Sequence, residues 1–334
     1  MSALNNLLIP AVLFFALGVI TRLIRSDLRL PPDLAKMLSI YLLMAIGLHG
    51  GYALGEADLG KAFNAVVWAV ALGFALPLLG YVLLMATRRV DRMNAAAIAA
   101  HYGSVSAGTF LTAIAYLDNA GIDYESYPVI MLAVMESPAI IVGLLLASWS
   151  RQRLAVQDGG VASIETGSNN GQWRSLLHEA MTNGSVVLLI GSMAIGAISA
   201  PASMEKLFPF IDEIFMGVLC LFLFEMGMEA ARRLREFRKV GFVLVAFGLL
   251  MPLIGGLAGI AVGYLALGLG AGGTTLVAVL GASASYIAVP PAMRLAVPEA
   301  NPSFYLTLAL GITFPFNVVV GIPLYHHLAT LVIN

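Results

Sequence analysis

Charge is scarce in this sequence. Only 11% of its 334 residues are charged, whereas 60% are hydrophobic, and the mean hydropathy is +0.90. A soluble surface needs about a quarter of its residues charged, so the composition excludes a water-soluble fold. Long apolar runs separated by short polar segments instead indicate an all-α polytopic protein of the cell (inner) membrane.

Cysteine is also nearly absent, because Cys220 is the one cysteine in the chain. An internal disulfide and a thiolate metal cluster are therefore excluded. The net charge of −1 gives no reason to expect a nucleic-acid partner. The metalloprotease and serine-hydrolase motifs HExxH and GxSxG do not occur, so we expect neither enzyme activity nor a cofactor.

The apolar runs predict ten spans, since a membrane helix needs about 20 residues. We place them at 7–24, 37–54, 64–86, 94–117, 127–149, 184–200, 211–231, 240–266, 272–297 and 303–331. The polar segment between the fifth and sixth spans, residues 151–182, is expected to lie in the cytoplasm. It contains a mobile loop over Gln157–Gln172 and a short interfacial helix over Trp173–Ala180.

Five short motifs recur in the same order at offsets of 175 to 180 residues. The pairs are Ala16–Ile20 with Ala194–Ile198, Ile46–Leu48 with Met226–Met228, Pro77–Gly80 with Pro252–Gly255, Ser104–Ser106 with Ser283–Ser285, and Pro138 with Pro315. This order predicts a tandem duplication of residues 1–150 and 183–334. Five spans per copy is an odd number, so the second copy enters the membrane inverted, which is typical of secondary transporters.

The basic residues predict the orientation. With both termini outside, the inner loops hold 16 of the 18 lysines and arginines, and Lys61 and Lys206 lie outside. Inserting or removing one span would destroy this bias. The positive-inside rule therefore supports ten spans.

The fourth and ninth spans each contain a run of small residues. They read HYGSVSAGTF (His101–Phe110) and LGASASYIAVPPAM (Leu280–Met293). Such runs permit a helix to break, and the freed backbone groups must then line a cavity because lipid cannot satisfy them. Corresponding breaks in two inverted copies are expected to cross near the membrane midplane and to form a transport site. The alternative is that the small residues only allow close helix packing.

A broken helix exposes the groups that bind ions. The N–H groups at a half-helix N-terminus favour a small anion without any buried lysine or arginine. Free carbonyl and hydroxyl oxygens at the same break can ligate Na⁺. The hydroxyls available are those of Ser104, Ser106, Thr109, Ser283 and Ser285.

Glu136 is the acidic residue of greatest interest. It lies about ten residues into the fifth span, where an acid is costly and functional by default. The alternative is a carboxylate that reaches a water-filled vestibule without binding a ligand. In the corresponding part of the tenth span, Thr313 and Asn317 offer neutral oxygens one helical turn apart. Asn317 could equally serve as a helix–helix hydrogen bond.

Other polar residues in the spans are interpreted as structural. His49 and Glu229 occupy matching positions in the two halves, which favours interfacial or packing roles. His101 could relay a proton, but beside Tyr102 it is more typical of a packed, hydrogen-bonded residue. His327 lies near the outer end of the last span, and we predict no role for it.

Three stretches resemble the SbtA-type sodium-dependent bicarbonate transporters. They are AAHYGSVSAGTF (Ala99–Phe110), VMESPAIIVGLLL (Val134–Leu146) and LGASASYIAVPPAMRLAVPEANPS (Leu280–Ser303), and the similarity extends from the first span through Asn317. The resemblance implies a homotrimer in which a mobile core moves like an elevator against a fixed scaffold. It also implies inward bicarbonate transport driven by Na⁺, and a possible cytosolic PII-like (SbtB-type) regulator.

The oxygen and N–H groups of the two runs, taken together with the resemblance, predict the site residues. The substrate would contact Gly103, Ser104, Val105, Ser106, Ala282, Ser283, Ala284 and Ser285. Sodium would be bound by Thr109, Glu136, Ser137, Thr313 and Asn317. The residues themselves leave other possibilities open: another small anion or organic acid, H⁺ coupling through Glu136 or His101, or a membrane receptor that does not transport.

Overall fold

The computed structural model of the chain describes residues 10–28, 30–55, 58–157, 184–234, 237–287 and 289–333. Within these ranges every regular element is a helix. Six helices there are long and apolar enough to cross a membrane: Asp33–Gly55, Leu59–Ala86, Tyr127–Arg151, Pro209–Arg233, Gly241–Ala266 and Pro302–Ile333. Shorter apolar helices cover Pro10–Leu23, Val187–Ile198 and Ala271–Ala282. The chain is therefore a multi-pass helical membrane protein, as its composition predicts.

Helices occupy all ten predicted segments. The first half forms α2 (Pro10–Leu23), α3 (Pro32–Gly55), α4 (Leu59–Ala86), α5 (Arg92–Gly103), α6 (Ala107–Ala120) and α7 (Tyr127–Gln157). The second half forms α9 (Gly184–Ile198), α10 (Pro201–Met204), α11 (Phe215–Leu234), α12 (Phe237–Ala261), α13 (Ala271–Ala282), α14 (Val289–Ala296), α15 (Pro302–Leu306), α16 (Phe314–Phe316) and α17 (Ile322–Ile333). The predicted interfacial helix Trp173–Ala180 lies outside the described residues, as does the predicted loop after Gln157.

Short π-helical segments interrupt the second half. Pro209–Glu213 precedes α11, Val262–Ala266 extends α12, and Thr307–Thr313 and Asn317–Gly321 join α15, α16 and α17. A π-helical turn widens the helix and is found most often at functional positions. The last span, which carries Thr313 and Asn317, has two of them.

Local sequence explains where several helices begin. Asp58 and Asp91 are N-caps whose carboxylates accept N–H groups from the first turns of α4 and α5. Asn301 caps α15 in the same way. These side chains satisfy donors that a helix N-terminus would otherwise leave without a partner.

Glycines allow two pairs of helices to pack in close contact. A Cβ atom on Gly18 of α2 would lie 2.0 Å from the carbonyl oxygen of Phe224, and one on Gly227 of α11 would lie 2.1 Å from that of Phe15. Between α3 and α9, a Cβ atom on Gly196 would lie 2.2 Å from the carbonyl oxygen of Leu48. Only glycine permits such an approach of two backbones.

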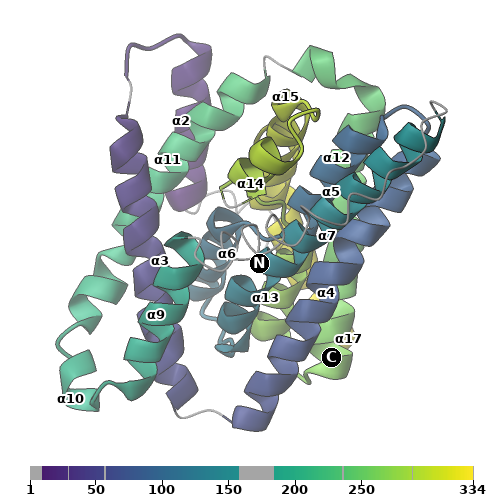
Figure 1. Cartoon of the computed structure of the whole chain (residues 1–334). Helices are drawn as coiled ribbons and strands as arrows, with labels where there is room; N and C mark the ends of the chain where they lie inside the picture. Colours follow the sequence, from purple (N-terminus) through teal and green to yellow (C-terminus); the bar gives the residue numbers. More distant parts are fainter. Residues whose placement is uncertain are drawn as a thin grey trace.

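The helices form two groups with a centre between them (Figure 1). The helices α2, α3, α9 and α11 lie on one side, and α4, α5, α7, α12 and α17 lie on the other, with α6 and α13 between the groups. The breaks between α5 and α6 and between α13 and α14 therefore fall inside the molecule, where polar backbone can be satisfied by protein.

Candidate functional site: the crossing of two broken helices

The first break separates α5 from α6. Ser104 ends α5 in an extended conformation (φ −91°, ψ 178°), and Ser106 is the N-cap of α6. The Ser106 hydroxyl oxygen accepts hydrogen bonds from the backbone N–H of Thr109 at 3.1 Å and from its hydroxyl at 2.9 Å. A Cβ atom on Gly103 would lie 2.4 Å from the Pro77 ring. Because Gly103 has no side chain, Pro77 of α4 can pack directly against the backbone at the break.

The second break follows α13 and repeats this geometry. Ser283 ends α13 with φ −91° and ψ 165°, and its hydroxyl donates a hydrogen bond to the Leu280 carbonyl at 3.0 Å. The next helix, α14, begins at Val289. The sequence predicts an interruption within each of the runs His101–Phe110 and Leu280–Met293, and both helices end inside these runs.

The two breaks hold each other by hydrogen bonds in both directions. The Ser106 N–H donates to the Ser283 hydroxyl oxygen at 3.0 Å, and the Ser285 N–H donates to the His101 carbonyl at 2.8 Å. Ser104, Ser106, Ser283 and Ser285 are each at most 3% exposed. The chain thus joins segments about 180 residues apart at one buried crossing.

The tenth predicted span supports the second break through neutral side chains. Asn317 donates from Nδ2 to the Ala282 carbonyl at 2.8 Å, and its Oδ1 accepts from the Tyr325 hydroxyl at 3.1 Å. The Thr313 hydroxyl donates to the Gly248 carbonyl at 2.7 Å.

Thr313 also accepts a hydrogen bond, because its own proton is used on Gly248. The donor is the Tyr102 hydroxyl at 2.6 Å. Thr313 and Asn317 therefore already make hydrogen bonds within the protein, and their role as sodium ligands stays a prediction.

Around the crossing, other polar atoms are buried without partners. Neither Oε2 of Glu136 nor Oγ of Ser104 has a hydrogen-bond partner among the described residues. An unsatisfied carboxylate oxygen in a dry interior is costly, so such an atom points to a bound cation or a proton.

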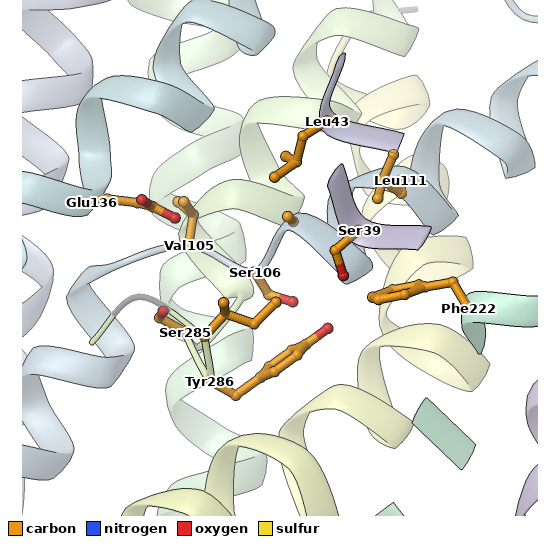
Figure 2. Close-up of a pocket in the computed structure, with 11 residues that line it drawn as sticks. Ser39, Leu43, Val105, Ser106, Leu111, Glu136, Phe222, Ser285 and Tyr286 are labelled. Carbon is orange, nitrogen blue, oxygen red and sulfur yellow. The ribbon is translucent and has the colours of Figure 1, made fainter. Parts of the chain in front are cut away.

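Glu136 faces a small cavity between the crossing and the α3–α11 side of the molecule, here called the crossing cavity (Figure 2). Its volume is about 20 Å³, room for about one water molecule or one dehydrated cation. The polar side chains that line it are Ser39, Ser106, Glu136, Ser285 and Tyr286. Figure 2 shows Glu136 and Ser285 on one side of the cavity and Ser39 and Phe222 on the other.

The two breaks offer different groups to an ion. The first-turn N–H groups of Ala107 and Gly108 have no intrahelical acceptor, and Ala107 lines the crossing cavity. The start of α14 contains Pro290 and Pro291, which have no N–H. The start of α6 therefore suits an anion better than the start of α14 does, because it has more free N–H groups. Glu136 is the acidic side chain at the cavity and so suits a cation.

The structure brings together some of the predicted residues and not others. Val105, Ser106, Glu136 and Ser285 line the crossing cavity. The remaining predicted residues lie in or beside the breaks or their supports but do not line it: Gly103, Ser104, Thr109, Ser137, Ala282, Ser283, Ala284, Thr313 and Asn317. The site assignments as a whole stay a prediction.

Sequence reasoning missed Ser39, Tyr286 and Glu225. Ser39 is one serine in an apolar helix, and nothing in its neighbours marks it. Tyr286 lies within the SASYIAVP run of the second break, so its inclusion would have followed from the run itself. Glu225 is an acid inside a predicted span, and the criterion that selected Glu136 would have found it.

Two residues interpreted as structural make ion pairs. His49 lies 3.3 Å from Asp212, at the wall of a cavity of about 300 Å³ between α3, α6 and the segment before α11. Glu229 pairs with Arg232 at 2.8 Å and with Arg233 at 2.9 Å. Both observations agree with interfacial or packing roles.

Comparison with known families identifies the family of the chain. A sequence model of the Na⁺-dependent bicarbonate transporter superfamily matches residues 10–330. The chain belongs to that superfamily. It is a transporter family and not an enzyme family, and its ligands are bicarbonate and Na⁺. A search of curated proteins found no match.

Proposed function

We propose that this superfamily member carries bicarbonate into the cell by symport with Na⁺, and that the crossing of the two broken helices is its binding site. The observation that carries the proposal is the unpartnered Oε2 of Glu136 beside the first break. A carboxylate is an acceptor for cations, and the adjacent start of α6 supplies N–H donors for an anion.

This arrangement gives a physical reason why the binding of Na⁺ and the binding of bicarbonate would be coupled. A carboxylate beside the anion site repels bicarbonate unless a cation lies between them. Two unit charges about 4 Å apart interact by about 4 kcal/mol at an effective dielectric constant of about 20. Na⁺ at Glu136 would replace that repulsion with attraction. Each ion would then strengthen the binding of the other, which is the requirement for symport.

Alternating access is the proposed mechanism, with α2, α3, α9 and α11 as the scaffold and the remaining helices as a mobile core that moves as an elevator. The crossing cavity is too small for bicarbonate, which has four heavy atoms, so the site must open for substrate to enter. The cavity also lies where α3 and α11 meet the crossing, which is the boundary between the two groups.

The inverted repeat is part of this proposal. In the proposed repeat, α2 corresponds to α9 and α3 corresponds to α11. Its support is that α2 packs on α11 and α9 packs on α3, so each first helix contacts the second helix of the other copy. Matching glycines, Gly18 and Gly196, stand at the two contacts. The nearly equal backbone angles of Ser104 and Ser283 give independent support.

We further propose ten spans with both termini outside. Arg92 and Arg153 lie 5.8 and 4.5 Å from the ring of Trp149, and Arg151 bonds Glu299 at 2.8 Å. Basic residues of two predicted inner loops, and Glu299 of a third, thus gather at one end of the bundle, in agreement with the positive-inside rule.

The homotrimer and the cytosolic PII-like regulator rest on the family resemblance alone. The mass of the protein in lipid nanodiscs, measured by light scattering, tests the first: a trimer has three times the protomer mass of 35.2 kDa. Nucleotide-dependent inhibition by an added PII-like protein tests the second.

Uptake of radiolabelled bicarbonate into proteoliposomes tests the function. The proposal requires uptake with an inward Na⁺ gradient and none when K⁺ replaces Na⁺. Competition by chloride, sulfate and short carboxylates would identify another anion as the substrate. Uptake that follows an H⁺ gradient without Na⁺ would assign H⁺ coupling to Glu136, which is the second candidate because that carboxyl lacks a partner.

A further inference from the structure

A second acidic side chain approaches the crossing from the other side. Glu225 lies on α11, three residues after Phe222, which lines the crossing cavity. Residues three apart on a helix share a face. Oε2 of Glu225 is buried, and within the part of the chain that the structure describes it has no hydrogen-bond partner.

Arg232 and Arg233 of α11 make their ion pairs with a different acid, Glu229. Glu229, one turn further along, takes both available guanidinium groups on a single oxygen: Arg232 at 2.8 Å and Arg233 at 2.9 Å. Two acids and two bases thus lie on α11, and both of these ion pairs go to the same acid, Glu229. The acid nearer the crossing has neither of these ion pairs. A protein that needed Glu225 only for structure would pair it, because an unpaired buried charge is strongly unfavourable.

Glu225 also adjoins the second break. The ring of Phe222, on the same face of α11, lies 3.0 Å from the place that a Cβ atom on Gly108 would occupy. Tyr286 lines the crossing cavity, and its hydroxyl lies 2.3 Å from the place that a Cβ atom on Gly108 would occupy. Because Gly108 has no side chain, the Tyr286 hydroxyl can pack against the backbone at the start of α6. Tyr286 and Phe222 therefore lie beside each other at the start of α6, and Glu225 lies one turn of α11 from that contact.

We propose that Glu225 is a second sodium-binding carboxylate, which holds Na⁺ on the α11 side of the crossing with the Tyr286 hydroxyl as a neighbouring oxygen ligand. A carboxylate and a hydroxyl oxygen are hard ligands suited to Na⁺, and a charged carboxylate repels bicarbonate. The inference rests on the proposed symport and adds a residue on the scaffold side, where the family resemblance assigned none.

The test is the Na⁺ dependence of bicarbonate uptake in Glu225→Gln proteoliposomes. We expect the Na⁺ concentration for half-maximal uptake to rise by about tenfold, because a charge-assisted ligand is removed. The bicarbonate concentration for half-maximal uptake at saturating Na⁺ should stay unchanged. Glu225→Asp keeps the carboxylate and should restore part of the Na⁺ affinity.

The control variant is Glu213→Gln, because Glu213 is an exposed acid in the π-helical segment that precedes α11. It should behave as wild type. Binding of radioactive sodium to the purified proteins, measured without bicarbonate, gives a readout that does not depend on transport. It should be weaker in Glu225→Gln and unchanged in Glu213→Gln.

The outcomes separate this inference from the proposed function. If wild type shows no Na⁺-dependent uptake, the symport proposal is wrong. If wild type does transport, a Glu225→Gln variant with wild-type sodium affinity overturns the inference alone. A lower maximal rate with unchanged sodium affinity would also overturn it, because that result describes a structural role.

Discussion

The two broken helices share a backbone conformation and differ in what surrounds it. Ser104 and Ser283 end their helices with nearly the same φ and ψ, yet α6 begins directly after Ser106 whereas α14 begins only at Val289. The first break presents N–H donors and faces an unpartnered Glu136. The second break is followed by prolines, and Asn317 satisfies its Ala282 carbonyl.

This difference indicates how a duplicated fold can divide its work. The proposed repeat preserves the geometry that makes two helices cross, and both copies have serines there: Ser104 and Ser106 in the first, Ser283 and Ser285 in the second. The side chains that approach each break are free to diverge. Glu136 of the first copy aligns with Thr313 of the second at an offset of 177 residues. In the proposed function, the first break supplies Glu136, while Ser283 and Asn317 hold the second break in place and its Ser285 and Tyr286 face the same cavity.

Glu136→Gln tests the functional side of the comparison and should have the largest effect. We expect the Na⁺ concentration for half-maximal uptake to rise by about 10- to 100-fold, since a charged ligand becomes a neutral one. Stability should change by less than about 1 kcal/mol, because the wild-type carboxylate has no protein partner to lose. Uptake kinetics and thermal unfolding in detergent measure the two quantities. A large loss of stability with normal sodium affinity would reverse the roles of the two breaks.

Asn317→Ala tests the anchoring side. The change leaves the Ala282 carbonyl and the Tyr325 hydroxyl without partners, which should lower the free energy of unfolding by about 1–3 kcal/mol. Asn64→Ala is a matched control, because Asn64 donates one hydrogen bond to the Ala266 carbonyl away from the crossing. Thermal unfolding should place Asn317→Ala below this control. Unchanged stability with a specific loss of sodium affinity would instead make Asn317 a sodium ligand.

Alanine variants of two serines in the second break should separate an effect on stability from an effect on transport. Ser283→Ala removes the acceptor of the Ser106 N–H and should cost about 1 kcal/mol of stability. Ser285→Ala leaves the backbone N–H bond to His101 intact but removes a hydroxyl from the cavity wall. We expect normal stability and a reduction in Na⁺-dependent uptake of about fivefold. Wild-type uptake in this variant would exclude Ser285 from the site.

How far the sequence alone predicts this site depends on the kind of contact. The breaks at Ser104 and Ser283 follow from small residues in an apolar run, and the importance of Glu136 follows from its depth. The hydrogen bond from Ser106 to Ser283 could not be derived from spacing, because it depends on how distant helices pack. Ser39 was missed for the same reason: its own hydrogen bond to Ala35 is that of an ordinary helical serine.

The predictions for the tenth span illustrate another limit. Thr313 and Asn317 were selected as oxygen donors one turn apart, and the structure confirms that both are buried near the crossing. The sequence does not reveal that Tyr102 and Tyr325 reach them from elsewhere. A neutral polar residue inside a membrane helix can ligate an ion or satisfy the protein, and only its neighbours distinguish the two.

The turn between α14 and α15 should respond weakly to pH. Two hydrogen bonds from the Arg151 guanidinium hold the pKa of the Glu299 carboxyl below its ordinary value. A lowered pKa in the folded state means that the stabilisation is present at neutral pH and is lost as the pH falls through that pKa. Both side chains are more than a third exposed, so Glu299→Gln should cost less than about 1 kcal/mol. Thermal unfolding between neutral and acidic pH checks this, and a larger loss would show that the turn anchors the second break.

His327→Ala should have no effect on uptake or on stability. His327 is exposed on α17, away from both breaks. Uptake measured beside the other variants provides the comparison. A strong loss of transport would mean that the last span is placed wrongly with respect to the crossing.

The most direct test of the central claim compares wild type and Glu136→Gln in one uptake experiment. Proteoliposomes containing either protein receive radiolabelled bicarbonate with an inward Na⁺ gradient or with K⁺ in its place, and protein-free vesicles correct for CO₂ leak. We expect wild type to take up bicarbonate only with Na⁺. At the same sodium concentration, uptake by Glu136→Gln should be close to the level measured with K⁺ in place of Na⁺. Equal Na⁺-driven uptake by the two proteins would contradict the assignment of sodium coupling to the first break.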